Sequence, residues 1–275
     1  MTPMASAVLA MPHAPSLVMP SAQWWFTVWL AIPLAVVLLI GLNHLRTGRG
    51  PLLLFCVIGG AIASAFEAIV NVLGGMIYAE NGIWTAYEAF DRKIPVLIPM
   101  AYAWFMGGQA YLCYRIFVNG CARRRVFELW AIFCVIDAVI ETPGLLAGVY
   151  TYFGAQPWNF WGFPFWYGWA NSLVPIVAGA AIFKLLPVFG GGWRQLAIIP
   201  LLPMANGLAY ATTCWPIWLV LNNDLGYAAT YPASLVTLAL TCYVLWMVAR
   251  IVVPDPKAAT VQTDFLRGRT PEGSI

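Results

Sequence analysis

The chain has 275 residues, of which 61% are hydrophobic and only 9% are charged, and its mean hydropathy is +0.77. A soluble domain of this length cannot bury so much apolar surface, so lipid must be its solvent. The formal net charge of +3 indicates neither a nucleic acid nor an acidic surface as a partner. The composition therefore predicts an integral membrane protein surrounded by membrane lipids.

Residues 1–23 are predicted to form a short N-terminal tail, because they are interrupted by prolines and lack the basic region of a signal peptide. Seven apolar stretches follow, each long enough to cross the hydrocarbon core, which takes roughly 20 residues. They cover residues 24–42, 51–74, 94–117, 127–149, 165–189, 196–221 and 232–253. Pro200, Pro203 and Pro216 predict a kink in the sixth. The sequence thus predicts an all-α bundle of seven transmembrane helices over 24–253, with a C-terminal tail over 254–275.

The basic residues predict the orientation of this bundle. Twelve of the fourteen lysines and arginines fall on one side of the predicted membrane, and only Arg92 and Lys93 fall on the other. Because cytoplasmic loops carry the excess of basic residues, we expect a multi-pass protein of the cell membrane, with its N-terminus outside and its C-terminus in the cytoplasm. The outer loops are instead rich in aromatic residues, above all over 150–169.

Two segments of the chain resemble each other. Residues 67–78 read EAIVNVLGGMIY and residues 141–152 read ETPGLLAGVYTY, with Glu, Gly and Tyr at the same offsets. Each copy is followed by an aromatic loop and a return span, and both run in the same direction. The sequence therefore predicts a parallel repeat of a helix hairpin. Spans six and seven would be a degenerate third copy, in which Asn206 or Thr212 replaces the carboxylate.

Three acids lie inside predicted spans, away from their ends: Glu67, Asp137 and Glu141. An ionised carboxylate near the bilayer centre is costly, so such residues normally face the bundle interior and indicate a functional site. Asp137 and Glu141 are four residues apart, as are Glu67 and Asn71, so each pair shares one helical face. Glu67 and Glu141 also lie at similar depth, which allows one pocket to hold all three acids. Desolvation and like-charge repulsion favour the neutral form of at least one, the form that a general acid needs.

Each of these residues has a second interpretation. The acids can instead be hydrogen-bonding residues that join helices. The aromatic residues near them can stabilise a carbocation with their ring faces, or anchor the chain at the membrane interface. The mid-span amides Asn171 and Asn206 either orient a carboxyl group or join helices. The aromatic residues considered for substrate binding are Tyr78, Trp84, Tyr150, Tyr152, Trp158 and Trp161.

Several classes of membrane protein are disfavoured by missing residues. His13 and His44 lie outside the span interiors, so axial histidine ligation of a haem is not expected. The last predicted helix has no lysine for a retinal Schiff base. Nucleotide-binding, serine-hydrolase and zinc-protease motifs are missing, and so is the aspartate-rich pair that would hold magnesium on a diphosphate. We therefore expect no metal and no other cofactor.

The run GVYTYFGAQPWNFWGFPFWYGWAN at 148–171 follows a membrane carboxylate and combines Gly, Tyr, an aromatic loop and a proline-containing re-entry. Over residues 60–180 this pattern resembles the carotenoid hydratases and the heterodimeric lycopene cyclases, and also the small seven-helix meroterpenoid cyclases. The resemblance implies membrane acids that protonate an olefin or epoxide, with Glu67 and Glu141 in their positions. Through Glu67 and WTAYEAFD at 84–91, the chain more weakly resembles sterol isomerases of the emopamil-binding type.

The leading hypothesis is a membrane enzyme of isoprenoid, terpenoid or carotenoid-type lipid metabolism. It would use its buried carboxylates for proton-initiated cyclisation, hydration or double-bond isomerisation of a lipophilic isoprenoid. Glu141 is the expected acid, Asp137 its partner, and Glu67 with Asn71 the opposing base or cation stabiliser. The rival hypothesis is a non-catalytic protein, either a proton-coupled transporter or a lipid-binding membrane protein, that uses the same acids.

Overall fold

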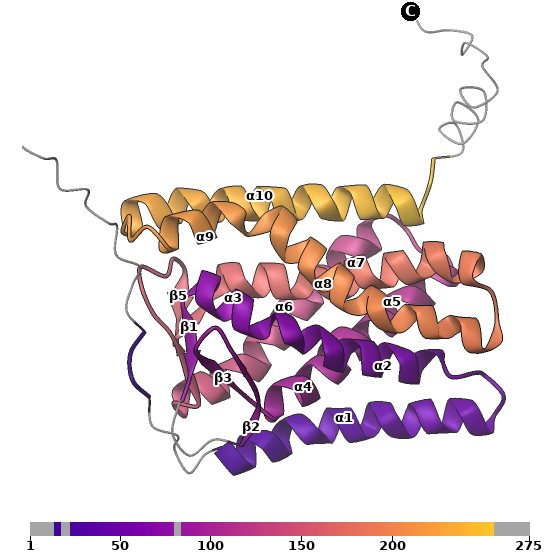
Figure 1. The fold of residues 1–275 in the computed structure, drawn as a ribbon. Coiled ribbons are helices and arrows are strands. Elements are labelled where there is room, and N and C mark those ends of the chain that lie inside the picture. Colours follow the sequence, from indigo (N-terminus) through magenta and orange to yellow (C-terminus); the bar gives the residue numbers. More distant parts are fainter. Residues whose placement is uncertain (1–13, 18–22, 80–83, 256–275) are drawn as a thin grey trace, which may run out of the picture.

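The computed structural model describes residues 14–17, 23–79 and 84–255, which are mostly helical (Figure 1). Within these ranges, six helices are long and apolar enough to cross a membrane. They cover Gln23–Arg46, Leu52–Gly74, Arg124–Leu146, Phe165–Phe189, Gly192–Thr213 and Tyr227–Val252. Of the two predicted tails, all residues but 14–17, 23, 254 and 255 lie outside the described part of the chain.

The outer surface of the helices is apolar and their interior contains polar side chains. Large apolar residues such as Leu39, Val135 and Met204 are exposed, whereas Asn71 and Ser172 are completely buried. This distribution is the reverse of a soluble bundle, and it is the one expected where the hydrocarbon of a bilayer surrounds the helices. The chain is therefore a membrane protein.

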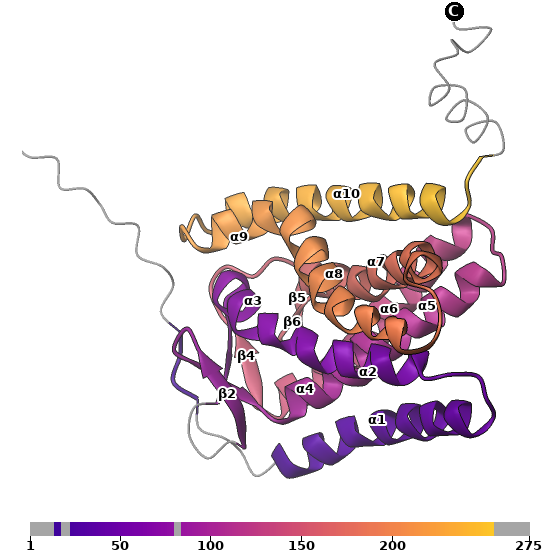
Figure 2. The ribbon, with the colours of Figure 1, turned by 45° about the vertical axis from the view of Figure 1, so that its right-hand side comes forward.

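Helix α7 (Phe165–Phe189) is at the centre of the bundle. It packs against α5 (Gln109–Val118), α6 (Arg124–Leu146), α8 (Ile198–Thr213) and α10 (Tyr227–Val252). α1 (Gln23–Arg46) and α10 (Tyr227–Val252) lie on opposite flanks, as both ribbon views show (Figures 1 and 2). The strands gather at one end of the bundle (Figure 1).

The third predicted span, 94–117, is not among the six long apolar helices. It forms α4 (Leu97–Tyr102), a π-helical turn (Ala103–Gly108) and α5 (Gln109–Val118) in direct succession. The π-helical turn packs very closely on α2, because a Cβ atom on Gly107 would lie only 2.2 Å from the carbonyl oxygen of Cys56. π-helical turns of this kind often lie at functional sites.

Two of the six spans are also interrupted. The second consists of α2 (Leu52–Ala63), a 3₁₀ turn (Ser64–Phe66) and α3 (Glu67–Gly74). The sixth predicted span consists of a 3₁₀ turn (Gly192–Ala197), α8 (Ile198–Thr213) and α9 (Trp215–Leu221). The break between α8 and α9 falls at Cys214, just before Pro216, whereas Pro200 and Pro203 lie within the continuous helix α8.

Short strands are the main departure from the predicted all-α fold. They form three antiparallel pairs: β1 (Met76–Tyr78) with β4 (Tyr150–Tyr152), β2 (Thr85–Ala89) with β3 (Arg92–Pro95), and β5 (Asn159–Phe160) with β6 (Phe163–Pro164). All three residues of β1 are buried. In β1 and β4, which are mostly buried, this pairing satisfies backbone N–H and C=O groups of segments that have left a helix.

Candidate functional site

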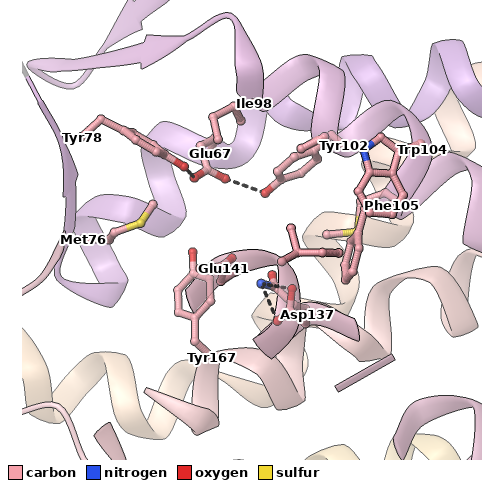
Figure 3. Close-up of a pocket in the computed structure, with 14 residues that line it drawn as sticks. Glu67, Met76, Tyr78, Ile98, Tyr102, Trp104, Phe105, Asp137, Glu141 and Tyr167 are labelled. Carbon is pink, nitrogen blue, oxygen red and sulfur yellow. Dashed lines mark hydrogen bonds between the residues drawn. The ribbon is translucent and has the colours of Figure 1, made fainter. Parts of the chain in front are cut away.

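Glu67 begins α3, directly after the 3₁₀ turn, and its side chain points into the bundle. Its two carboxyl oxygens each accept a hydrogen bond of 2.6 Å, Oε1 from the Tyr78 hydroxyl and Oε2 from the Tyr102 hydroxyl (Figure 3). Asn71, one helical turn later, is a further hydrogen-bond partner. Only 4% of Glu67 is exposed, so neutral donors replace the water that this group would otherwise bind.

Glu141 lies near the end of α6 and has longer hydrogen bonds. Its Oε2 accepts from the hydroxyls of both Tyr150 and Tyr152, each at 3.2 Å. Tyr150 also donates to the backbone carbonyl of Glu141, at 2.9 Å. Within the described part of the chain, no donor reaches Oε1 of Glu141 at hydrogen-bond distance. Oε2 therefore accepts from Tyr152 and shares the single hydroxyl proton of Tyr150 with the backbone carbonyl, whereas Oε1 is open.

Asp137 lies one turn before Glu141 on α6 and is held from α7. The side-chain nitrogen of Asn171 donates to both carboxyl oxygens of Asp137, at 3.2 and 3.4 Å. The side-chain oxygen of Asn171 in turn accepts a hydrogen bond from Tyr210 on α8. Because Asp137 is only 3% exposed, this chain of amide and hydroxyl contacts is its main source of polar stabilisation.

All three acids line a single cavity, whose walls come from α3, β1, α4, the π-helical turn, α6 and α7 (Figure 3). The cavity has a volume of about 60 Å³. Since one water molecule takes about 10–15 Å³ on this scale, it has room for about four to six water-sized groups. The other lining residues are Met76, Tyr78, Ile98, Ala101, Tyr102, Trp104, Phe105, Met106, Ile140, Tyr167 and Asn171.

The two glutamates have equivalent tyrosine partners. Glu67 accepts a hydrogen bond from Tyr78 and Glu141 accepts one from Tyr152, in each case from the residue eleven positions later. These are the Glu and Tyr positions that the two similar segments of the sequence share. The matching offsets thus correspond to matching contacts.

The pairing of β1 with β4 brings these two segments together. Ile77 and Thr151 are directly opposite each other, and each lies ten residues after the glutamate of its own segment. Met76 pairs with Tyr152 and Tyr78 with Tyr150, so the register is symmetric about the central pair. The strand pair therefore has a local two-fold relation, and the two acids approach the cavity from opposite sides of it.

The tyrosines in these strands act as neutral donors. Tyr78, Tyr150 and Tyr152 lie outside the membrane-spanning helices, and burial raises the pKa of each hydroxyl well above its usual range. The neighbouring carboxyl groups raise it further. The described residues that line the cavity include no lysine, arginine or histidine. No cluster of three or more side chains placed to hold a metal ion is found in the described ranges.

Four of the predicted substrate-binding residues lie away from the cavity. Trp84 and Trp161 are 58% and 73% exposed. The Trp158 indole donates to a serine on α10 and its ring packs against Tyr231. Asn206 is buried, but its amide donates to the backbone carbonyl of a residue in α2. These four residues are therefore not part of the candidate site.

Sequence reasoning missed four aromatic residues of the site that carry a hydroxyl or indole group, and also Phe105, which lines the cavity. Tyr102 donates to Glu67, Tyr210 donates to Asn171, and Trp104 and Tyr167 line the cavity. All four fall within predicted spans, so hydroxyl and indole groups at membrane depth were a signal that could have drawn attention to them. None of them lies in the two similar segments, 67–78 and 141–152.

No protein-family model, no curated protein and no solved structure matches this chain. The function must therefore be argued from the geometry of the three acids and their donors.

Proposed function

We propose that this protein is a membrane enzyme that protonates a lipophilic isoprenoid and so starts a cyclisation, hydration or double-bond isomerisation. The observation that carries the proposal is that three carboxyl groups line one small cavity whose other walls are neutral donors and apolar groups. Among the described residues that line it, none is basic. Such a cavity favours proton transfer, because its carboxylates have no positively charged partner there and are neutralised by binding a proton.

The hydrogen bonds suggest different roles for the two glutamates. Glu67 accepts a short bond on each oxygen, an arrangement that suits a carboxylate. Glu141 receives both donors on Oε2, and its open Oε1 is suited to carry a proton. We assign Glu141 as the general acid and Glu67 as the base or cation stabiliser. Asp137, one turn away, is assigned as the partner that favours the protonated form of Glu141 by its proximity.

The proposed reaction begins with transfer of the Glu141 proton to an olefinic carbon, which leaves a carboxylate on Glu141 and a carbocation on the lipid. The aromatic faces of Tyr102, Trp104 and Phe105 would stabilise this cation. The step ends when the cation loses a proton to Glu67, or when water adds to it and gives its surplus proton to Glu67. Either route restores a neutral lipid.

The size of the cavity limits how a substrate would bind. About 60 Å³ accommodates only an end group of a few heavy atoms. The rest of an isoprenoid chain would lie outside the cavity. Met76 and Met106 in the cavity wall are flexible side chains that can move aside for a larger group.

We also propose seven transmembrane spans, with the consecutive helices α4 and α5 forming the third. The arrangement of basic residues supports an external N-terminus and a cytoplasmic C-terminus. The symmetric register of β1 and β4 supports a parallel repeat of a helix hairpin. Reporter fusions test the topology: an external N-terminal tag with a cytoplasmic C-terminal tag is expected, and two tags on the same side would contradict an odd number of spans.

A second function, proton-coupled transport, is favoured by the small volume of the cavity. A space for about four to six water-sized groups suits proton handling without a bound lipid. The two functions are separated by extraction of lipids from cells with and without the gene, followed by mass spectrometry. A new isomeric or hydrated isoprenoid is expected for the enzyme. An unchanged lipid profile despite normal expression would exclude it and favour transport.

A further inference from the structure

Tyr167 has a buried hydroxyl group that takes no part in the hydrogen bonds around the three acids. Only 3% of the residue is exposed, and its oxygen has no hydrogen-bond partner. The side chain projects from the start of α7 into the cavity, toward the space between Glu67 and Glu141 (Figure 3). A buried hydroxyl without a hydrogen-bond partner is destabilising, so we expect a ligand or water at this position that accepts a hydrogen bond from it.

The ring of Tyr167 is held in place by its neighbours. It packs edge-on against Tyr152 and Trp166, with ring centroids 5.2 Å away in both cases, and lies 6.0 Å from the ring of Tyr210. On another side, a Cβ atom at Gly74 would lie 2.9 Å from the edge of the ring. The hydroxyl is therefore a donor with a fixed direction.

A second unpartnered donor is found on a residue of the cavity wall. The indole nitrogen of Trp104 is buried without a hydrogen-bond partner, and Trp104 lines the cavity. The acids add acceptors, whereas Met76, Ile98 and Ile140 make an apolar wall. The cavity thus combines the unpartnered Tyr167 hydroxyl with acceptors and a hydrocarbon surface, which is the pattern of a site for an amphipathic end group.

We infer that Tyr167 is the oxygen-binding residue of this site, and that the ligand is a lipid whose end group in the cavity carries a hydroxyl or carbonyl oxygen. The Tyr167 hydroxyl donates to that oxygen, while the attached carbons contact the apolar wall. The volume of about 60 Å³ fits an end group with one oxygen and a few carbons. This inference rests on the proposed function only in taking the bound lipid as the substrate.

Binding of three probes to the purified full-length protein in lipid nanodiscs tests the inference. The probes are farnesol, the ketone geranylacetone and the hydrocarbon β-farnesene. We expect farnesol and geranylacetone each to bind about tenfold more tightly than β-farnesene, which corresponds to one hydrogen bond to a buried donor. In Tyr167→Phe this preference should vanish, while the affinity for β-farnesene stays the same.

Tyr243→Phe is the matched control, because Tyr243 is an exposed tyrosine on α10, stacked on Trp246. It should keep the preference, and thermal unfolding checks that both variants are folded. Equal affinity of the wild type for all three probes would overturn the inference, because water alone would then occupy the site. The inference would also be overturned if farnesol, but not geranylacetone, bound more tightly than β-farnesene, since the alcohol would then be donating to a carboxylate. Persistence of the preference in Tyr167→Phe would have the same consequence.

Failure of this inference can be distinguished from failure of the proposed enzyme. If lipid conversion depends on Glu141 but the three probes bind equally, the enzyme stands and the oxygen subsite falls. If the probes bind as expected but no lipid is converted, the subsite stands and the protein is a lipid-binding or transport protein.

Discussion

The segments around Glu67 and Glu141 have similar sequences, but the hydrogen bonds that their carboxyl groups accept are different. Tyrosine hydroxyls bind both oxygens of Glu67, at 2.6 Å, but only one oxygen of Glu141, at 3.2 Å. The difference arises because Glu67 accepts a hydrogen bond from Tyr102 of α4, whereas both tyrosines that donate to Glu141 come from the single strand β4. A donor from outside the two similar segments thus makes the two glutamates chemically unequal.

The largest expected effect of this inequality is on catalysis. Glu141→Gln keeps the shape of the side chain but removes the proton that the open Oε1 would carry, so lipid conversion should fall by about 10²- to 10⁴-fold. Mass spectrometry of lipids from cells that express each variant measures the change. Glu128→Gln, on the exposed part of the same helix, is the control and should leave conversion unchanged. Full conversion by a well-expressed Glu141→Gln variant would exclude this residue as the proton source.

The next effect is on stability and should be seen at Glu67. A glutamine has only one acceptor oxygen, so Glu67→Gln places an NH₂ group against one of two tyrosine donors and should lower the free energy of unfolding by about 1–3 kcal/mol. Glu141→Gln can direct its NH₂ group to the open side and should change stability far less. Thermal unfolding in nanodiscs compares the two. Equal losses of stability would contradict the assigned difference between the acids.

Part of this site could be predicted from the sequence. The inward direction of Glu67 and Glu141 follows from the cost of placing an acid against lipid, and the position of Asp137 on the same side follows from helical spacing. The contacts of Tyr78 and Tyr152 lie at the offsets that the two similar segments of the sequence share. These features are local along the chain or are imposed by the membrane.

The rest depends on tertiary packing that no local pattern encodes. The strands β1 and β4 are only three residues long, too short for a period-two pattern, and they form because the two segments meet. Tyr102 reaches Glu67 from a different helix, next to a π-helical turn packed on α2. Trp158 and Trp161 look like site residues in the sequence, but β5, β6 and the loop around them direct these side chains to α10 and to the surface.

Gly74 and Gly148, which lie at the same offset in the two similar segments, give a third test of the comparison between these segments. Gly74 packs on Tyr167, so Gly74→Ala should cost about 1–3 kcal/mol of stability by overpacking and should displace the Tyr167 ring. Gly148 has open space around it but a φ of +70°, so Gly148→Ala should cost about 1–2 kcal/mol through backbone strain alone. Unfolding measurements give both losses, and binding of farnesol separates them. Reduced farnesol binding in Gly148→Ala would show that this glycine also shapes the cavity.

The smallest expected effect concerns Tyr152. Its hydroxyl shares Oε2 of Glu141 with Tyr150, so Tyr152→Phe leaves that oxygen with one donor and should lower the free energy of unfolding by only about 0.5 kcal/mol.

Tyr78→Phe is the matched variant at the equivalent position. It removes the sole tyrosine donor to Oε1 of a more deeply buried carboxyl group, at 2.6 Å, and should cost about 1–3 kcal/mol. The two tyrosines occupy the same offset, so any difference between the variants reflects the surroundings of each acid and not the local sequence. A loss in Tyr152→Phe as large as that in Tyr78→Phe would mean that Tyr150 does not compensate. The longer bonds of Glu141 would then be as important for folding as the short bonds of Glu67.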